Sequence, residues 1–277
     1  MTDSGKSIRL HRILDADTHK GVVVAFDHGL MLGPIPGISP PRERIGMFLE
    51  GGADAVLLSP GVLRAGAEVF AGKKAGVIVR LDWTNMWRDP KLLGFAEGSS
   101  CAIAMVEDAV RWGADAVLTY LFVGLTEAAS EAEEVRRNAE VNRACERLGM
   151  VHIVEPMARG SRVQRANSKE FVALHTRMAG ELGADLIKTD FLDQESDTVE
   201  VVSTSLVPVL LAGGPKISES SALGVIERSV RAGAAGIVFG RNVFQAADPV
   251  AFLRDTRRVI HGATETHPAG GGAVEAR

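Results

Sequence analysis

The sequence predicts an α/β fold, a single closed (β/α)8 TIM barrel, because one helix-to-strand unit recurs along it. One phrase occurs four times, as "EGGADAVLLSPG" from Glu50, "RWGADAVLTY" from Arg111, "ELGADLIKTD" from Glu181 and "RAGAAGIVFG" from Arg231. In each copy a helix ends at a glycine that can adopt the left-handed conformation, and an apolar strand follows that is buried on both faces. Further strands of this type begin near Gly21, Ala75, Met150 and Leu206, which makes eight. Strict alternation of eight strands with helices is typical of the barrel.

The segments between the strands carry the helical pattern. Residues 100–112 and 219–232 place apolar side chains at i, i+3, i+4 and i+7, which predicts amphipathic helices. An open, doubly wound sheet would show the same alternation, so alternation alone does not establish closure. The even spacing of the strands, and the lack of a G-x-G-x-x-G motif after the first, favour the closed barrel.

One domain accounts for the chain. We expect residues 1–262 to form the barrel, with residues 8–20 as an N-terminal helix that closes its bottom and residues 1–7 loose. Residues 263–277 are rich in Gly and Ala without a core pattern, which predicts a disordered tail.

Composition excludes several function classes. The net charge of −4 comes from intermixed acids and bases, without the basic stripe and interleaved aromatics of a nucleic-acid-binding protein. The two cysteines, Cys101 and Cys145, form no CxxC pair, so we expect neither a disulfide framework nor a zinc site, and a cytoplasmic location. No apolar leader or run of about 18 apolar residues predicts export or a membrane span.

Polar side chains cluster where the predicted strands end. Active sites of these barrels form at the carboxyl ends of the strands, so polar residues there are candidate functional groups. The set comprises Asp27, His28, Arg80, Asp82, Glu155, Lys188, Asp190, Lys216 and Arg241. On the barrel prediction, all of them face one mouth.

Lys188 is the sharpest candidate, because it interrupts an apolar strand. Alternation from Leu186 points its side chain inward, just below the mouth. Burying an ammonium is costly unless it is paired with an acid or gives up its proton, and a neutral amine attacks carbonyls to form Schiff bases. The alternative is a structural ion pair with Asp27 or Glu155.

Two glycine turns follow strands seven and eight, "LLAGGPK" at 210–216 and "GIVFGRN" at 236–242. Loops at these positions often bind phosphate, because glycine lets the backbone N–H groups approach an anion closely. The candidate phosphate ligands are Gly213, Gly214, Lys216, Gly240 and Arg241. Each turn could be merely structural, but the pair with its cations predicts a phosphorylated substrate.

Five segments in order, "AFDHGLMLGPIPG", "GGADAVLLSPG", "GADLIKTD", "LAGGPK" and "AGIVFGRNVFQ", resemble the archaeal-type class I fructose-bisphosphate aldolase family. That family includes aminodideoxyheptulosonate synthase and related Schiff-base aldolases, and the similarity extends from about Ile8 to His261. It implies a lyase without metal or other cofactor that acts on a phosphorylated ketose. Lys188 would form the imine and Asp27 would assist proton transfer. Relatives assemble as rings, often decamers, which implies a homo-oligomer.

The resemblance breaks down on strand five. Close relatives have "YPRG", whose tyrosine takes part in proton transfer, and this chain has "MARG" with Met157 at that place. Glu155 in "VEPM" is similar to the "EP" strand of tagatose-bisphosphate aldolases, which implies that Glu155 handles protons instead. We expect Arg80 and Asp82 to recognise the distal end of the substrate.

The roles of two candidate residues and the identity of the substrate stay open. His28 is expected at the substrate, or else bonded to a loop carbonyl, and Asp82 could instead be a structural partner of Arg80. The aldehyde half of the substrate stays open. A synthase, transaldolase or thiolase would use the same lysine, and a barrel that has lost its chemistry would only bind sugar phosphates.

Overall fold

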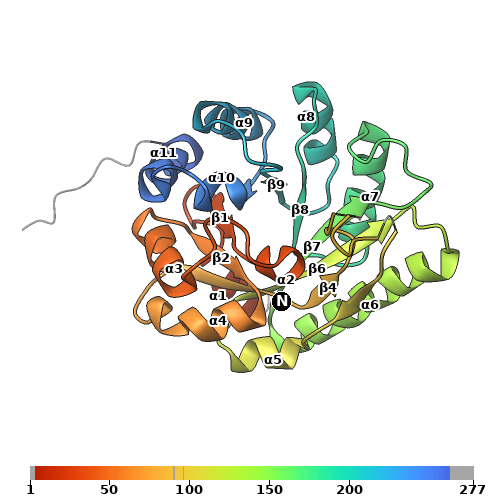
Figure 1. Ribbon diagram of the computed structural model, residues 1–277, viewed down its shortest axis with the longest axis horizontal. Coiled ribbons are helices and arrows are strands. Elements are labelled where there is room, and N and C mark those ends of the chain that lie inside the picture. Colours follow the sequence, from red (N-terminus) through yellow and green to blue (C-terminus); the bar gives the residue numbers. More distant parts are fainter. Residues whose placement is uncertain (1–3, 90, 96, 263–277) are drawn as a thin grey trace, which may run out of the picture.

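The computed structural model describes residues 4–89, 91–95 and 97–262, and its centre is a closed barrel of eight parallel strands (Figure 1). The strands are β1 Gly21–Ala25, β2 Ala55–Leu58, β3 Gly76–Arg80, β6 Ala116–Val123, β7 Val151–Ala158, β8 Leu186–Asp190, β9 Val209–Ala212 and β10 Gly236–Phe239. Strand β1 pairs with both β2 and β10, which closes the sheet. The predicted barrel is therefore confirmed, and the open sheet is excluded.

Helices surround the barrel (Figure 1). They are α1 Ser4–Leu10, α2 Gly29–Leu32, α3 Pro41–Glu50, α4 Pro60–Gly66, α5 Val106–Arg111, α6 Ala128–Leu148, α7 Lys169–Glu181, α8 Glu195–Ser203, α9 Glu219–Arg231, α10 Arg241–Phe244 and α11 Pro249–His261. A 3-10 turn, Ala67–Phe70, follows α4. Alternate strand residues divide the core: Val23, Ile78 and Leu186 belong to a cluster inside the barrel, whereas Val22 and Val79 pack under the helices.

The recurring "GAD" phrase has a structural cause at the amino-terminal end of the barrel. Asp54, Asp115 and Asp185 each accept a hydrogen bond from a backbone N–H of the preceding barrel strand. The donors are Val22 at 2.8 Å, Val77 at 3.0 Å and His152 at 2.8 Å, respectively. The aspartates thus close the bottom of the sheet, where these N–H groups would otherwise lack a partner.

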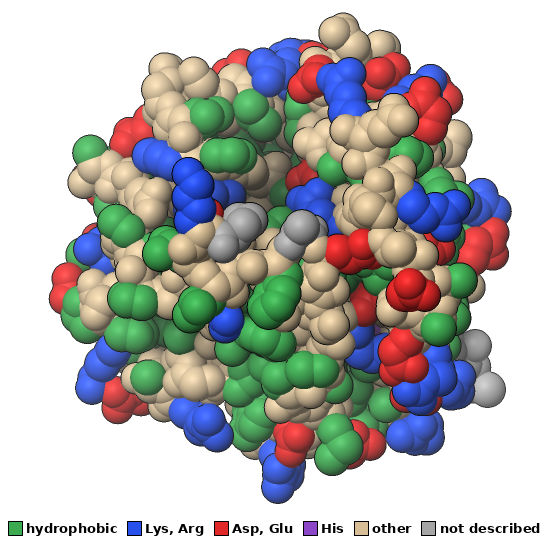
Figure 2. Space-filling model, turned by 45° about the vertical axis from the view of Figure 1, so that its right-hand side comes forward, with side chains coloured by type: hydrophobic (Ala, Val, Ile, Leu, Met, Phe, Trp, Pro, Cys, Tyr) green, Lys and Arg blue, Asp and Glu red, His purple; other side chains and the backbone are tan. Residues whose placement is uncertain are grey.

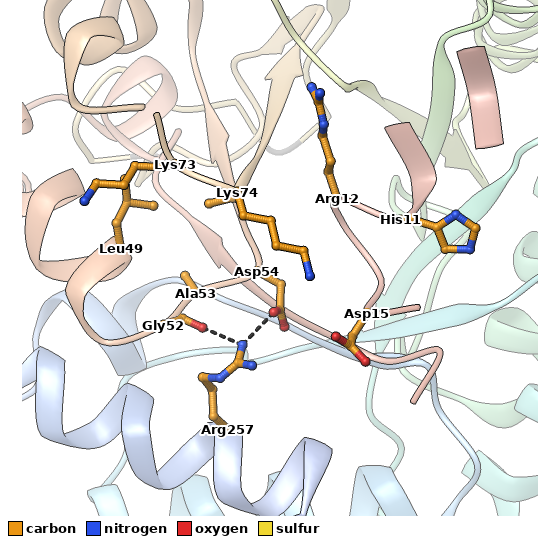
Figure 3. A pocket seen from close by; sticks show the side chains of 11 residues that line it. His11, Arg12, Asp15, Leu49, Gly52, Ala53, Asp54, Lys73, Lys74 and Arg257 are labelled. Carbon is orange, nitrogen blue, oxygen red and sulfur yellow. Dashed lines mark hydrogen bonds and ion pairs between the residues drawn. The ribbon is translucent and has the colours of Figure 1, made fainter. Parts of the chain in front are cut away.

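Each of these aspartates also binds a cation from the chain termini. Arg257 of α11 contacts Asp54 at 2.6 Å, and this ion pair lies beside a cavity of about 230 Å³ at the bottom of the barrel (Figure 3). Arg12 and Lys6 pair with the other two aspartates, Asp115 and Asp185. The fourth copy of the phrase has alanine in place of aspartate, and Gly236 there has φ 127° and packs directly on the Gly21 backbone.

The amino-terminal helix begins closer to the start of the chain than the sequence predicted. Helix α1 spans Ser4–Leu10, so residues 4–7 are not loose, and the expected helix at 8–20 ends soon after it begins. The reason is long-range pairing: Lys6 contacts Glu146 and Asp185, and Arg9 donates to the carbonyl of Gly149. The expected tail, 263–277, lies outside the described residues.

The segment 100–112 is only partly helical. Residues Ser100–Ala102 form β5, which pairs antiparallel with β4 (Asp82–Thr84), and the helix begins at Val106. The Asp108 carboxylate accepts from the backbone N–H of Met105 at 3.0 Å and fixes that start. The helical prediction for 100–105 is wrong because pairing with β4 overrides the local apolar pattern.

Candidate active site

A cavity of about 380 Å³ lies at the carboxyl ends of the barrel strands, and Figure 2 shows the hollow with basic side chains at its edge. Its wall includes Asp27, His28, Arg80, Tyr120, Glu155, Met157, Arg159, Lys188, Gly213, Gly214, Gly240 and Arg241. Because these residues come from seven different strands or the loops after them, only the closed barrel brings them together.

Lys188 lies on β8, with its side chain pointing into the barrel as its alternation predicts. It is 8% exposed, and its Nζ is 2.6 Å from Oε1 of Glu155 on the neighbouring strand β7. The ion pair that the sequence offered as the structural alternative is therefore present. The pair forms part of the cavity wall, within reach of a bound molecule, so it does not exclude chemistry.

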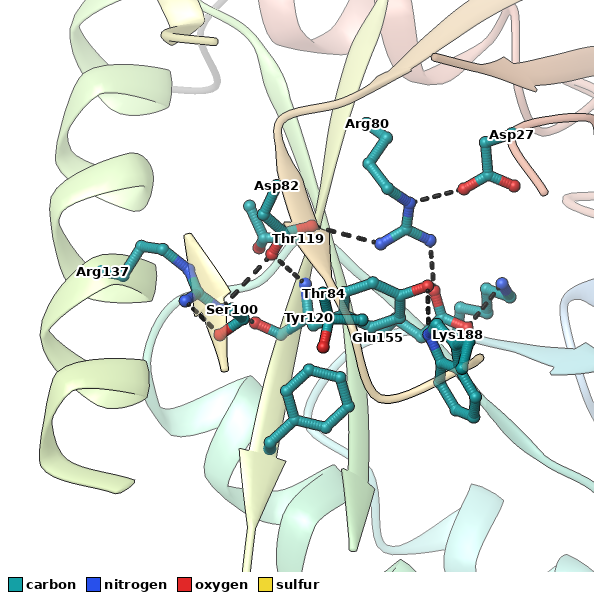
Figure 4. A network of polar contacts seen from close by, with 12 residues as sticks. Asp27, Arg80, Asp82, Thr84, Ser100, Thr119, Tyr120, Arg137, Glu155 and Lys188 are labelled. Carbon is teal, nitrogen blue, oxygen red and sulfur yellow. Dashed lines mark hydrogen bonds and ion pairs between the residues drawn. The ribbon is translucent and has the colours of Figure 1, made fainter. Parts of the chain in front are cut away.

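Arg80 is the centre of a buried network (Figure 4). Its Nε donates to Asp27, its Nη2 donates to Oε2 of Glu155, and its Nη1 donates to Asp82 at 3.2 Å. The guanidinium also lies 3.8 Å from the centre of the Tyr120 ring, in cation–π geometry. Arg80 is 1% exposed, and its fork holds three acids in place at the cavity wall.

The two predicted proton-transfer acids are held as carboxylates. Burial alone would raise the pKa of Asp27, but the charges of Arg80 and Lys188 outweigh it and lower that pKa overall. Burial likewise opposes ionisation of Glu155, and Lys188 and Arg80 together lower its pKa. Both groups are therefore suited to accept protons rather than to donate them.

Asp82 lies behind the cavity rather than on its wall. It is fully buried, accepts from the backbone N–H of Tyr120 at 2.7 Å, and lies 3.3 Å from Arg137 of α6. Burial raises its pKa to about 6, although Arg80 and Arg137 act in the opposite direction. These contacts support the alternative that Asp82 is a structural partner of Arg80.

The two glycine turns meet at the cavity. Arg241 donates to the carbonyl of Gly214 at 3.1 Å, and its buried Nε has no partner among the described residues. Asn242 donates to the carbonyls of Gly213 and Pro215, which ties the two turns together. Of the two predicted cations, Arg241 lines the cavity, whereas Lys216 is exposed and lies outside its wall.

His28 occupies the space that Gly240 leaves open. A Cβ at position 240 would come within 2.3 Å of the imidazole, so only glycine fits beside the ring in this position. The ring also packs edge-to-face on Phe244 at 5.3 Å. Burial lowers the pKa of His28, and its Nδ1 has no hydrogen-bond partner in the described part of the chain. The imidazole is therefore neutral and bonded to no loop carbonyl through Nδ1.

Tyr120 and Arg159 line the cavity although the sequence did not point to them, and both contact Trp87 on its wall. Trp87 donates to the hydroxyl of Tyr120 at 3.0 Å, and the guanidinium of Arg159 lies 4.7 Å from the Trp87 ring. Tyr120 ends the second copy of the recurring phrase, in "GADAVLTY", where it is indistinguishable from a core residue. Its being the sole tyrosine of the chain was the one available signal.

Low pH should destabilise the folded protein by protonating Asp27 and Glu155. Their folded-state pKa values lie below the ordinary 3.8 and 4.5, so the ion pairs stabilise the protein above those values. That stabilisation is lost as the pH falls through the folded-state pKa values. We expect the free energy of unfolding, from urea denaturation, to fall between about pH 5 and about pH 3. Glu155→Gln should show a shallower fall, and equal slopes would contradict this account.

Comparisons with known proteins agree with the geometry. A 2-amino-3,7-dideoxy-D-threo-hept-6-ulosonate synthase of Halobacterium salinarum is 35% identical over 262 residues, covering 94% of this chain and 93% of that protein. An uncharacterised aldolase of Saccharolobus solfataricus is 32% identical over 260 residues, covering 93% and 94%. A 3-hydroxy-5-phosphonooxypentane-2,4-dione thiolase of Salmonella typhimurium is 30% identical over 259 residues, covering 94% and 83%.

Solved structures show the same relationship. A crystal structure of an archaeal fructose 1,6-bisphosphate aldolase is 29% identical, with a TM-score of 0.81 over 93% of this chain and 100% of that one. The family model described as DeoC/LacD family aldolase matches residues 21–246. The expected aldolase function and enzyme class are thereby confirmed, and the chain belongs to the DeoC/LacD aldolase family.

Proposed function

We propose that the protein is a class I aldolase in which Lys188 forms a Schiff base with the ketone of a phosphorylated ketose. One observation carries this proposal: a buried lysine, two carboxylates and two glycine turns line a single cavity at the catalytic end of the barrel. An archaeal fructose-1,6-bisphosphate aldolase structure, 28% identical with a TM-score of 0.81, has its catalytic Lys covalently bound to a carbinolamine intermediate. That relative supports the same use of a lysine here.

The Lys188–Glu155 pair supplies the nucleophile. When a ketose displaces water from the cavity, transfer of a proton from the ammonium to Oε1 of Glu155 leaves a neutral amine that can attack the ketone. Loss of water then gives a protonated imine, which draws electrons from the neighbouring C–C bond. Glu155, once again a carboxylate, takes the proton of the C4 hydroxyl as that bond breaks.

After cleavage, the aldehyde leaves and an enamine remains on Lys188. Protonation of the enamine carbon and hydrolysis of the imine release the second product and restore the amine. Asp27, which accepts from the same Arg80 guanidinium as Glu155, is expected to assist the remaining proton transfers. No step in this scheme requires a metal ion or other cofactor.

Arg241 and the glycine turns are the proposed phosphate anchor. An anion accepting from the unpartnered Nε of Arg241 would be held beside Gly213 and Gly214, at a fixed distance from the amine. We expect Arg241→Ala to raise KM for a ketose phosphate about tenfold or more, since a charge-assisted hydrogen bond contributes about 1.5–3 kcal/mol. Steady-state kinetics test this, with Arg228→Ala, an arginine that does not line the cavity, as the control. An unchanged KM would remove Arg241 from the anchor.

The proposal has a direct test. The protein is incubated with dihydroxyacetone phosphate and borohydride, and intact mass and peptide mapping locate the reduced adduct. An adduct on Lys188 supports the Schiff base, and its absence with every phosphorylated ketone tried would leave only a sugar-phosphate-binding barrel. One relative is named a synthase and another a thiolase, so products from a panel of ketose phosphates and aldehydes are needed to separate aldolase, synthase and thiolase activity.

The proposal also covers the oligomeric state of the protein and its cellular location. We infer a homo-oligomer, with a decamer as the size to test by light scattering, and a small-molecule substrate rather than nucleic acid. A cytoplasmic location is consistent with Cys101 and Cys145, which are both free thiols. Within the described part of the chain, no helix is long and apolar enough to cross a membrane.

A further inference from the structure

Tyr120 lies in line with the proposed catalytic pair. The strand register pairs Tyr120 of β6 with Glu155 of β7, and pairs Val154 with Ile187, so that Glu155 and Lys188 follow in the next row. The three side chains therefore point into the barrel from adjacent strands at one level, about 4.8 Å apart in their backbones. Figure 4 shows the phenol beside Glu155.

The hydroxyl of Tyr120 has a proton without an acceptor. A phenol oxygen can accept one hydrogen bond and donate another, and Trp87 already supplies the first at 3.0 Å. Among the described residues, none accepts the proton of this hydroxyl, although the ring is only 3% exposed and lines the cavity. A buried donor without a partner costs free energy, so a substrate oxygen is the natural acceptor.

Glu155, the acid beside Tyr120, accepts hydrogen bonds in the resting site instead of donating one. The two oxygens of Glu155 accept from Lys188 and Arg80, and the pKa of Glu155 is lowered despite its burial. Burial and the nearby carboxylates raise the pKa of Tyr120 well above its ordinary value, although Arg80 opposes them. At neutral pH the row therefore holds one carboxylate that accepts protons and one phenol that donates them.

We propose that Tyr120 is a catalytic acid that protonates the departing oxygen during imine formation, a role that rests on the aldolase function proposed above. The carbinolamine oxygen takes the phenol proton while its C–O bond breaks, and the nitrogen lone pair forms the C=N bond as water leaves. The phenolate is stabilised by the Trp87 N–H and the Arg80 guanidinium, and takes back a proton from Glu155. In total, one ammonium and one ketone give one protonated imine and one water, and both hydrogens of that water derive ultimately from Lys188.

The first test removes only the oxygen. Tyr120→Phe keeps the ring under Arg80, so circular dichroism and thermal unfolding should match the wild type. With dihydroxyacetone phosphate and borohydride, we expect adduct formation at Lys188 to slow about 100-fold or more, and KM to change little. Trp87→Phe, which keeps the phenol and loses its hydrogen-bond donor, should slow adduct formation less.

The outcomes separate this inference from the function on which it rests. If the wild type forms the Lys188 adduct and Tyr120→Phe forms it within threefold of the same rate, Tyr120 is not the acid and the aldolase proposal stands. If the wild type forms no adduct, both proposals fail together.

A second test can be carried out even if the Tyr120→Phe variant does not fold. Because the chain contains one tyrosine, growth with a fluorotyrosine changes the acidity of Tyr120 alone. A more acidic phenol should move the alkaline limb of the rate–pH profile for adduct formation to lower pH, whereas a merely structural ring would leave that limb in place. The single fluorine resonance should also shift when dihydroxyacetone phosphate binds, and an unmoved resonance together with an unmoved pH profile would overturn the proposal.

Discussion

Lys188→Ala should abolish turnover and leave the barrel folded. Without the amine no imine can form, so the rate should fall by about 10⁴-fold or more, and the borohydride adduct should disappear. The fold should survive because Glu155 keeps its second partner, Arg80, after the lysine is removed. Activity assays, intact mass after borohydride and urea denaturation measure the three effects.

The control for Lys188→Ala is another lysine. Lys73 is exposed and lies beside the cavity at the opposite end of the barrel, so Lys73→Ala should keep both turnover and adduct formation. If Lys188→Ala retained an adduct elsewhere in the cavity, or kept measurable turnover, the nucleophile would have to be reassigned. Partial loss of the fold would instead show that the Lys188–Glu155 pair is needed for stability.

The barrel was predictable because its signal repeats. Four helix-to-strand units share a glycine before an apolar run, and four further strands have a similar apolar pattern, so eight weak local patterns support one another. Lys188 was predictable for the opposite reason, since one charged residue in an apolar strand contradicts its surroundings. The acid that Lys188 contacts, Glu155, is one of the two candidate partners named from the sequence, Asp27 and Glu155.

The features that could not be predicted from the sequence depend on contacts that form only in the folded structure. Arg80 contacts Asp27 and Glu155, which lie far from it in the sequence, and that grouping exists only after the barrel closes. Tyr120 could not be singled out because an aromatic residue within an apolar strand is also typical of a hydrophobic core. The β4–β5 hairpin arose from pairing between segments whose local patterns did not indicate it.

Arg80→Met should be the most destabilising of the substitutions considered. It leaves Asp27, Asp82 and Glu155 buried without their shared cation, and removal of one partner from a buried ion pair costs about 3–5 kcal/mol. Turnover should fall by about 100-fold or more, because both proton-transfer carboxylates lose the fork that orients them. Arg80→Lys should lose less stability, because an ammonium keeps the positive charge. It should still be less stable than the wild type, because an ammonium cannot bind all three acids at once.

The pH dependence of Arg80→Met identifies the cause. Without the guanidinium the folded-state pKa values of the three acids rise, so the stability deficit should be larger at pH 8 than at pH 5, where the acids can take up protons. A deficit independent of pH would point to lost packing against Tyr120 rather than to uncompensated charge. Arg136→Met is the matched control: Arg136 is an exposed arginine on α6 with two acidic partners, and its loss should change stability little. Urea denaturation of all three variants at both pH values, with the wild type alongside, decides between the two causes.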